Sequence, residues 1–318
     1  MGKIAFVFPG QGAQYVGMGK DFYEKYESFK KVLDRVNEIL DTPLKEKILN
    51  GPKEQLSLTE NTQPAVLAVS YAIYRTLVDN GFLKVEPDFV LGHSLGEYTA
   101  LVVAESLSYD EAVPLVRDRG KFMQEAVPPD VGAMAAIMGL APSRVETLCW
   151  EESDEENSVV PANYNSPNQI VVAGSKVAVD RVVQRAKDEG AKRVVYLDVS
   201  APFHTPLMKP AAEKLKDRLA KIEFRPLKYP LVANVDARIH TDPADIPNLL
   251  YFQTFSPVKW QQSIELLKNE GVTHFLEIGP GRTLVGLIRS IYPEAKLYNV
   301  AKVEQIDGLS DYLKTLED

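Results

Sequence analysis

The serine at position 94 stands between two close glycines, in the segment GHSLG at residues 92–96. This is the pattern G-x-S-x-G, in which a serine occupies a sharp turn between a strand and a helix and the glycines let the backbone bend tightly. A serine hydroxyl is a weak nucleophile at neutral pH and needs a base within hydrogen-bonding distance. Ser94 is therefore a candidate nucleophile, provided that the chain supplies the strand, the helix and the base.

The chain has four histidines that could supply the base. His204 lies in the segment APFHTPLM, a proline-punctuated loop between a predicted strand and a predicted helix, where catalytic groups commonly gather. His93 adjoins the serine and is expected to point elsewhere and support the turn. His240 is expected at the surface and His274 in the core. His204 is therefore the favoured base.

The elements around Ser94 agree with the motif, because an apolar strand at 88–92 runs straight into the serine and a helix follows at 95–105. The rest of the chain alternates in the same way. Helices are predicted at 20–40, 64–81, 110–126, 207–220, 257–271 and 281–290, and strands at 3–8, 231–237, 273–280 and 297–303. Such alternation implies an α/β fold with a mostly parallel sheet that is covered on both faces.

The middle of the chain follows a different pattern. Strands are predicted at 132–140, 158–164, 169–175 and 192–199, with helices at 143–151 and 176–190. The order β-α-β-β-α-β is the ferredoxin-like arrangement. We therefore expect a small ferredoxin-like subdomain at residues 128–198, inserted into a catalytic core made of residues 1–127 and 199–318.

Composition excludes several classes of function. The chain has 318 residues, of which 45% are hydrophobic, and a formal net charge of −8, which argues against nucleic acid as a partner. The single cysteine, Cys149, cannot form an internal disulfide, and no Cys/His cluster has zinc spacing. No apolar run is long enough to span a membrane, and the start lacks the pattern of a signal peptide. We expect a cytoplasmic protein without metal or redox cofactor.

Six segments in order resemble the family of malonyl-CoA:acyl carrier protein transacylases, which load malonyl units for fatty acid synthesis. They are FPGQGAQYVGMG, GHSLGEYTAL, RGKFMQEAVP, NYNSPNQIVVAG, APFHTPLM and FSPVKW, and the resemblance runs from residue 3 to about residue 290. It implies an α/β-hydrolase-like core with a ferredoxin-like insert, in agreement with the pattern above. It also implies a monomer that transfers malonyl from malonyl-CoA to the phosphopantetheine thiol of acyl carrier protein through a malonyl-serine.

The resemblance assigns the catalytic roles. Ser94 would be the nucleophile and His204 its base. Where Ser-His-Asp hydrolases orient the imidazole with a carboxylate, this family uses a main-chain carbonyl, placed here by the segment that holds Gln253. Asp198 and Asp236 remain alternatives for the orienting group.

The oxyanion hole would be formed by the backbone N–H groups of Leu95 and Gln11. Leu95 follows the nucleophile and opens a helix, so its N–H has no partner within the helix and the helix dipole favours negative charge there. The glycines around Gln11 let that backbone approach the reacting carbonyl closely.

The resemblance also places a substrate-binding set. Arg119 matches the arginine that binds the malonyl carboxylate, for which a guanidinium offers a planar fork of donors. Phe203 matches the residue type that accompanies malonyl rather than methylmalonyl substrates. Asn163 is expected either to face the cleft between the two subdomains or to form a turn, and His93 completes the set. Met134 is expected in the core.

Three other functions are compatible with parts of this pattern. A transacylase serving a polyketide or malonate pathway would use the same chemistry with a different carrier. A serine thioesterase or other hydrolase would share Ser94 and His204 but would not need Arg119. A non-catalytic docking module would need none of these residues. Because carrier proteins are acidic, a local basic surface is expected, with candidates Lys192, Arg193, Lys209, Lys214, Lys216 and Arg218.

Overall fold

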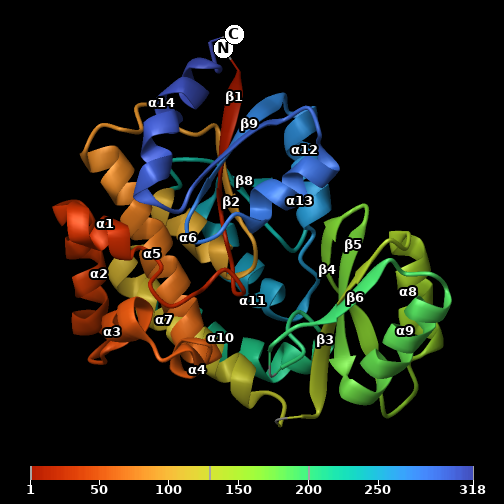
Figure 1. Cartoon of the computed structure of the whole chain (residues 1–318). Coiled ribbons are helices and arrows are strands. Elements are labelled where there is room, and N and C mark those ends of the chain that lie inside the picture. The colour runs from red at the N-terminus through yellow and green to blue at the C-terminus, as the bar shows by residue number, and fades with distance from the viewer. Residues whose placement is uncertain (1, 129, 200, 318) are drawn as a thin grey trace.

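A six-stranded sheet forms the centre of the larger part of the molecule (Figure 1). The computed structural model describes residues 2–128, 130–199 and 201–317. The strands of this sheet are β1 (Lys3–Phe8), β2 (Phe89–Gly92), β7 (Leu231–Val232), β8 (Ile239–His240), β9 (Val272–Ile278) and β10 (Lys296–Val300). Their order is β10-β9-β1-β2-β7-β8, and only β8 runs antiparallel to its neighbour. The predicted mostly parallel sheet is confirmed.

The sheet buries both faces because the side chains of β1 alternate. Ile4, Phe6 and Phe8 pack into one hydrophobic cluster, and Ala5 and Val7 pack into another on the opposite face, as the twofold period of a strand requires. Helices on the first face are α2 (Glu27–Leu40), α5 (Thr59–Asp79), α6 (Leu95–Val103), α7 (Tyr109–Glu125), α10 (Lys209–Leu219), α11 (Ile246–Phe255) and α14 (Ile306–Lys314). The opposite face is covered by α12 (Trp260–Asn269) and α13 (Thr283–Ile291).

A second, four-stranded antiparallel sheet lies beside this core, drawn in green in Figure 1. The sheet and its two helices follow one another along the chain as β3 (Gly132–Met138), α8 (Pro142–Glu151), β4 (Val159–Ser166), β5 (Gln169–Ser175), α9 (Lys176–Asp188) and β6 (Arg193–Tyr196). The strand order β4-β5-β3-β6 is ferredoxin-like, so the predicted βαββαβ insert is confirmed. Helices α8 and α9 cover one face. The other face carries Met134, Ala136 and Val171 and packs toward Phe203 and Met208.

Backbone hydrogen bonds join the two parts. The N–H of Tyr164 on β4 donates to the carbonyl of Val258 at 2.9 Å, and the N–H of Val258 donates to the carbonyl of Ala162 at 2.9 Å. A short parallel bridge between Asn163 and Val258 results. The small sheet is therefore continued, through β4, by the segment that leads into α12.

Several predicted boundaries were wrong. The helix expected at 20–40 is two helices, α1 (Lys20–Lys25) and α2, because Tyr26 between them is extended, with φ −122° and ψ 123°. The helix expected from residue 64 begins at Thr59, where side-chain bonds from Asn61 and Thr62 to preceding carbonyls support an extra turn. The short helices α3 (Leu44–Asn50) and α4 (Lys53–Leu56) precede it.

Differences also occur in the C-terminal half. The strand expected at 231–237 ends at Val232, and helices α11 and α14 were not predicted. The two ends of the chain meet at the top of Figure 1, where the N–H of Gly2 donates to the carbonyl of Leu316 at 2.7 Å. Within the described residues, no helix combines the length and apolarity needed to cross a bilayer.

Candidate active site

Ser94 occupies a tight turn between β2 and α6 that only small flanking residues permit. Its backbone has φ 52° and ψ −106°, a region that L-residues rarely adopt. A Cβ on Gly92 would lie 1.9 Å from the carbonyl carbon of Gly96, and one on Gly96 would lie 2.0 Å from the carbonyl oxygen of Phe8. Both glycines of the motif are therefore required by backbone packing, and the turn presents the serine at the end of β2.

The hydroxyl of Ser94 meets the imidazole of His204. The distance from Ser94 Oγ to His204 Nε2 is 2.7 Å, and His204 Nδ1 lies 2.8 Å from the main-chain carbonyl oxygen of Gln253. An Nδ1–H that donates to this carbonyl leaves the Nε2 lone pair directed at the serine. Asp198 is exposed and Asp236 accepts a bond from His240 at 3.0 Å, so neither carboxylate orients the imidazole.

Burial keeps His204 uncharged. The side chain is 3% exposed, and desolvation, reinforced by the nearby charge of Arg119, lowers the pKa of His204 to about 3. An imidazole that is neutral at physiological pH can accept a proton. The contact between Ser94 and His204 thus has the geometry and the protonation state that a nucleophile and its general base require.

A guanidinium lies beside the nucleophile without an acidic partner. Arg119 on α7 is 1% exposed. It donates from Nη1 to Gln63 Oε1 at 2.8 Å, and from Nη2 to Gln253 Oε1 at 2.9 Å and Ser94 Oγ at 3.1 Å. It also lies 5.3 Å from the ring of Tyr98. These partners are neutral, and no described residue forms a salt bridge with Arg119, so its positive charge is available to an anionic ligand.

Two backbone N–H groups are candidates for oxyanion donors. Leu95 directly follows the serine as the first residue of α6, and Gln11 lies in the loop after β1, which lines the same cavity as Ser94. No acceptor among the described residues takes either N–H, whereas the N–H of Ser94 is engaged by Asn234 Oδ1 at 2.7 Å. The side chain of Gln11 is held by Thr59 at 3.3 Å. The arrangement suits the stabilisation of an oxyanion by Leu95 and Gln11.

Ser94, His204, Arg119 and Gln11 line a cavity of about 830 Å³ between the core and the small sheet. That volume is in the range of cavities that bury drug-sized ligands. The wall from the core includes Gln11, Gln63, His93, Ser94, Arg119, Phe203, His204 and Leu287, and the wall from the small sheet includes Met134, Met138, Asn163, Val171, Arg193 and Val195. The predicted catalytic and substrate-binding residues from distant parts of the chain are therefore brought together, with both parts of the molecule contributing.

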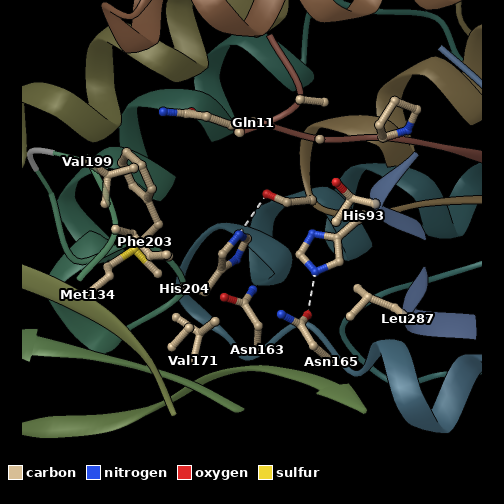
Figure 2. A pocket seen from close by; sticks show the side chains of 18 of the residues that line it. Gln11, His93, Met134, Asn163, Asn165, Val171, Val199, Phe203, His204 and Leu287 are labelled. Carbon is tan, nitrogen blue, oxygen red and sulfur yellow. Dashed lines mark hydrogen bonds between the residues drawn. The ribbon is translucent and has the colours of Figure 1, made fainter. Parts of the chain in front are cut away.

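Figure 2 shows how the remaining predicted residues lie. Asn163 and Val171 lie beneath the imidazole of His204, with Phe203 to one side. Asn163 is 4% exposed and Phe203 is 6% exposed. Of the two alternatives for Asn163, facing the cleft is the one that the structure shows. Met134 is buried as expected, but it also lines the cavity.

His93 turns away from the nucleophile toward the small sheet. Its Nε2 lies 2.8 Å from Asn165 Oδ1 on β4, and its ring lies 5.6 Å from that of Trp260. Burial lowers the pKa of His93. His93 therefore supports the turn through a hydrogen bond that connects the core with the small sheet, as Figure 2 shows.

The other two histidines lie outside this site. His274 is 2% exposed and bonds to Thr273 and Thr315, which confirms the predicted core position. His240 was expected at the surface, but its side chain is only 14% exposed because it is held between Asp236 and Asp245.

Four residues that contact the site were not singled out in the sequence: Gln63, Glu97, Asn165 and Asn234. Each is buried and carries a polar side chain. Such residues are rarely buried unless they are hydrogen-bonded, and a polar residue within an apolar segment is the signal that could have found them. Gln63 lies within the buried run of residues 61–70, directly before the apolar segment that begins at Pro64, and Asn234 follows an apolar strand.

Known proteins resemble this chain over nearly its whole length. Residues 5–306 match the acyl transferase domain family. A "malonyl CoA-acyl carrier protein transacylase" of Bacillus subtilis (strain 168) is 45% identical over 318 residues, covering 100% of this chain and 99% of that protein. One of the same name from Staphylococcus aureus (strain MRSA252) is 42% identical over 311 residues, covering 98% and 99%.

Solved structures agree with the sequence relatives. An acyl carrier protein S-malonyltransferase from Vibrio cholerae O1 biovar eltor str. N16961 superposes with a TM-score of 0.92 at 42% identity, covering 96% of this chain and 99% of that one. A malonyl-transacylase in complex with its type II PKS acyl-carrier protein, in the holo form, has a TM-score of 0.94 at 40% identity, covering 97% and 99%.

Proposed function

The chain belongs to the acyl transferase domain family, and from that premise we propose which residues carry its reaction. The reaction is transfer of a malonyl group from malonyl-CoA to the phosphopantetheine thiol of acyl carrier protein, for fatty acid synthesis. The observation that carries the assignment of residues is the buried Arg119 cation, which has only neutral partners and lies 3.1 Å from the nucleophile.

In the first half-reaction, Ser94 Oγ attacks the thioester carbonyl carbon and His204 Nε2 takes the hydroxyl proton. The N–H groups of Leu95 and Gln11 donate to the resulting oxyanion, and loss of one such donor typically raises a barrier by about 2.7–4 kcal/mol. The intermediate collapses with cleavage of the carbon–sulfur bond. The proton on His204 passes to the departing sulfur, which leaves CoA as a thiol and malonyl as an ester on Ser94.

The second half-reaction reverses these roles. The carrier thiol gives its proton to His204 and attacks the ester carbonyl, and the same two N–H groups stabilise the oxyanion. Collapse breaks the bond to Ser94 Oγ, which regains its proton from His204. The main-chain carbonyl of Gln253 holds the imidazole in the required orientation through both steps.

Arg119 accounts for the choice of a malonyl group over an uncharged acyl group. The distal carboxylate of malonyl would pair with its guanidinium, and this pairing would hold the ester carbonyl at the oxyanion donors. Phe203, Asn163 and His93 would shape the cavity around the acyl group and the pantetheine arm. An enclosed ester is protected from water, which favours transfer over the hydrolysis that a thioesterase would perform.

The same interpretation extends to further properties of the enzyme. We propose that CoA is the leaving group, that the enzyme is a cytoplasmic monomer and that it needs no metal or redox cofactor. We also propose that the core comprises residues 1–127 and 199–318 and the insert residues 128–198, a division supported by the two separate sheets. A polyketide carrier is an alternative partner, because one structural relative is bound to such a carrier.

The test is the intact mass of the purified enzyme mixed with malonyl-CoA in the absence of carrier, with Ser94→Ala alongside. We expect a malonyl adduct that maps to Ser94, is absent from the variant, and disappears when holo acyl carrier protein is added. Steady release of CoA and malonate without transfer would favour a hydrolase. Absence of both adduct and CoA release would point to a docking module or a different acyl donor.

A further inference from the structure

We propose that Asn234 is a positioning residue for the nucleophile, because its side-chain amide replaces a neighbouring strand at the turn that carries Ser94. The inference rests on the proposed role of Ser94. Neither the motif nor the family resemblance singles out Asn234, which follows the two-residue strand β7.

The geometry is that of an interrupted sheet. Strand β7 pairs with β2 at Val90 and ends at Val232. Beyond that point Asn234 Nδ2 donates to the carbonyl of Gly92 at 2.7 Å, and the N–H of Ser94 donates to Asn234 Oδ1 at 2.7 Å. In a parallel sheet, one residue of a strand bonds to the C=O of residue i and the N–H of residue i+2 of its neighbour. The primary amide of Asn234 offers the same donor and acceptor to residues 92 and 94.

The asparagine is itself fixed on all sides. It is fully buried, its N–H donates to Glu97 Oε2 at 2.7 Å, and its carbonyl accepts from the N–H of Lys259 at 2.9 Å. Glu97 lies on α6, and its own N–H donates to the carbonyl of Ser94 at 3.0 Å. A closed ring of bonds therefore links the nucleophile, Asn234 and the first turn of α6.

This ring explains how an unfavourable backbone conformation persists. A non-glycine residue with φ 52° is retained only when its surroundings over-determine it. The N–H of Ser94 is held by Asn234, and its carbonyl is held by Glu97 and by Gln253 Nε2 at 3.0 Å. Because the Ser94 N–H is engaged, the next donor along the chain, Leu95, is the one left for an oxyanion.

Two substitutions test the inference. Asn234→Ala removes both side-chain bonds, and we expect the single-turnover rate of Ser94 malonylation to fall about 100-fold, the scale of loss for a misplaced catalytic group. The KM for malonyl-CoA should change little, since Asn234 does not line the cavity. The matched control is Asn61→Ala, which removes a buried asparagine that bonds to the carbonyl of Gln55 on another helix; its rate should equal that of the wild type.

Asn234→Asp gives a pH dependence of the malonylation rate that would not appear if Asn234 served only to stabilise the fold. Its ionised carboxylate can accept from Ser94 but cannot donate to Gly92, whereas the protonated acid can do both. We therefore expect its malonylation rate to rise toward the wild-type rate as pH falls from 8 to 5.5. The titratable or charged groups around it, Glu97, Asp236 and Arg119, are present in the wild type, whose profile over the same range is the reference.

The outcomes separate this inference from the proposed function. Failure of the wild type to form the Ser94 adduct would remove the proposed function itself. A wild-type adduct together with a folded Asn234→Ala that reacts at the wild-type rate would overturn only the positioning role. A folded Asn234→Asp whose profile parallels the wild type, or loss of folding in Asn234→Asp, would also overturn it, because the residue would then serve stability alone.

Discussion

Arg119 is a buried arginine whose positive charge has no acidic partner among the described residues. Desolvation of the guanidinium is unfavourable, and burial lowers the pKa of Arg119. A buried charge is normally paired with an opposite charge, yet here Gln63, Gln253 and Ser94 supply only neutral partners. In the role that we propose for Arg119, the carboxylate of a bound malonyl group would supply the missing negative charge.

Removal of this guanidinium should therefore discriminate between acyl groups. In Arg119→Ala we expect kcat/KM with malonyl-CoA to fall about 100-fold, since hydrogen bonds to charged groups contribute about 1.5–3 kcal/mol. Activity with acetyl-CoA should be unchanged or higher, because acetyl has no carboxylate to pair. The measurement is the rate of carrier acylation with both donors. Arg117→Ala, on the same helix but bonded to Leu40 and Thr42, is the control, and equal losses with both donors would refute the carboxylate role.

At the scale of helices and strands, the sequence pattern predicts those features that depend on residues near one another in the chain. The turn at Ser94, the alternation of strands and helices and the βαββαβ insert depend on periodicity and on glycine spacing, and all three are present. The early end of β7 was not predictable, because it depends on the side chain of Asn234 meeting Gly92 from 142 residues away. The loop position of His204 made it the favoured base and the family resemblance paired it with Ser94, but no spacing predicts that the two side chains lie 2.7 Å apart.

Glu97 gives the junction between α6 and β7 a measurable pH dependence. Burial, opposed by the N–H of Asn234, raises the pKa of Glu97 to about 8. The folded state therefore keeps a proton that the unfolded chain loses from about pH 4.3 upward. Stability is full below that value and should decrease by up to about 1.4 kcal/mol per pH unit as pH rises toward 8.

Glu97→Gln tests this dependence without disturbing the contact. The glutamine oxygen can still accept from Asn234, but the side chain no longer ionises. Urea unfolding at pH 5 and pH 8 should show the wild type losing stability relative to the variant as pH rises, with little difference at pH 5. Parallel stabilities at both pH values would contradict the assignment of the titration to Glu97.

At the scale of the whole molecule, the cavity exists because two sheets are held at a fixed separation. The core supplies Ser94, His204 and Arg119, and the small sheet supplies Asn163 and the apolar floor. The joint consists of the paired backbones of β4 and Val258, together with the bond from His93 to Asn165. Because these bonds connect the two walls of the cavity, we expect them to limit the access of water to an acyl-serine.

The substitution Val258→Pro should weaken the connection between the core and the small sheet by removing one backbone N–H. Proline has no N–H, so the carbonyl of Ala162 loses its donor, and a buried acceptor left unpaired costs about 1–3 kcal/mol. We expect lower thermal stability and a larger fraction of malonyl-serine lost to water, measured as free malonate relative to malonylated carrier. Val258→Ala keeps the N–H while removing buried methyl groups, so it should destabilise the protein without raising that ratio. If both variants raised the ratio equally, the packing of the side chain, rather than the backbone joint, would be what excludes water.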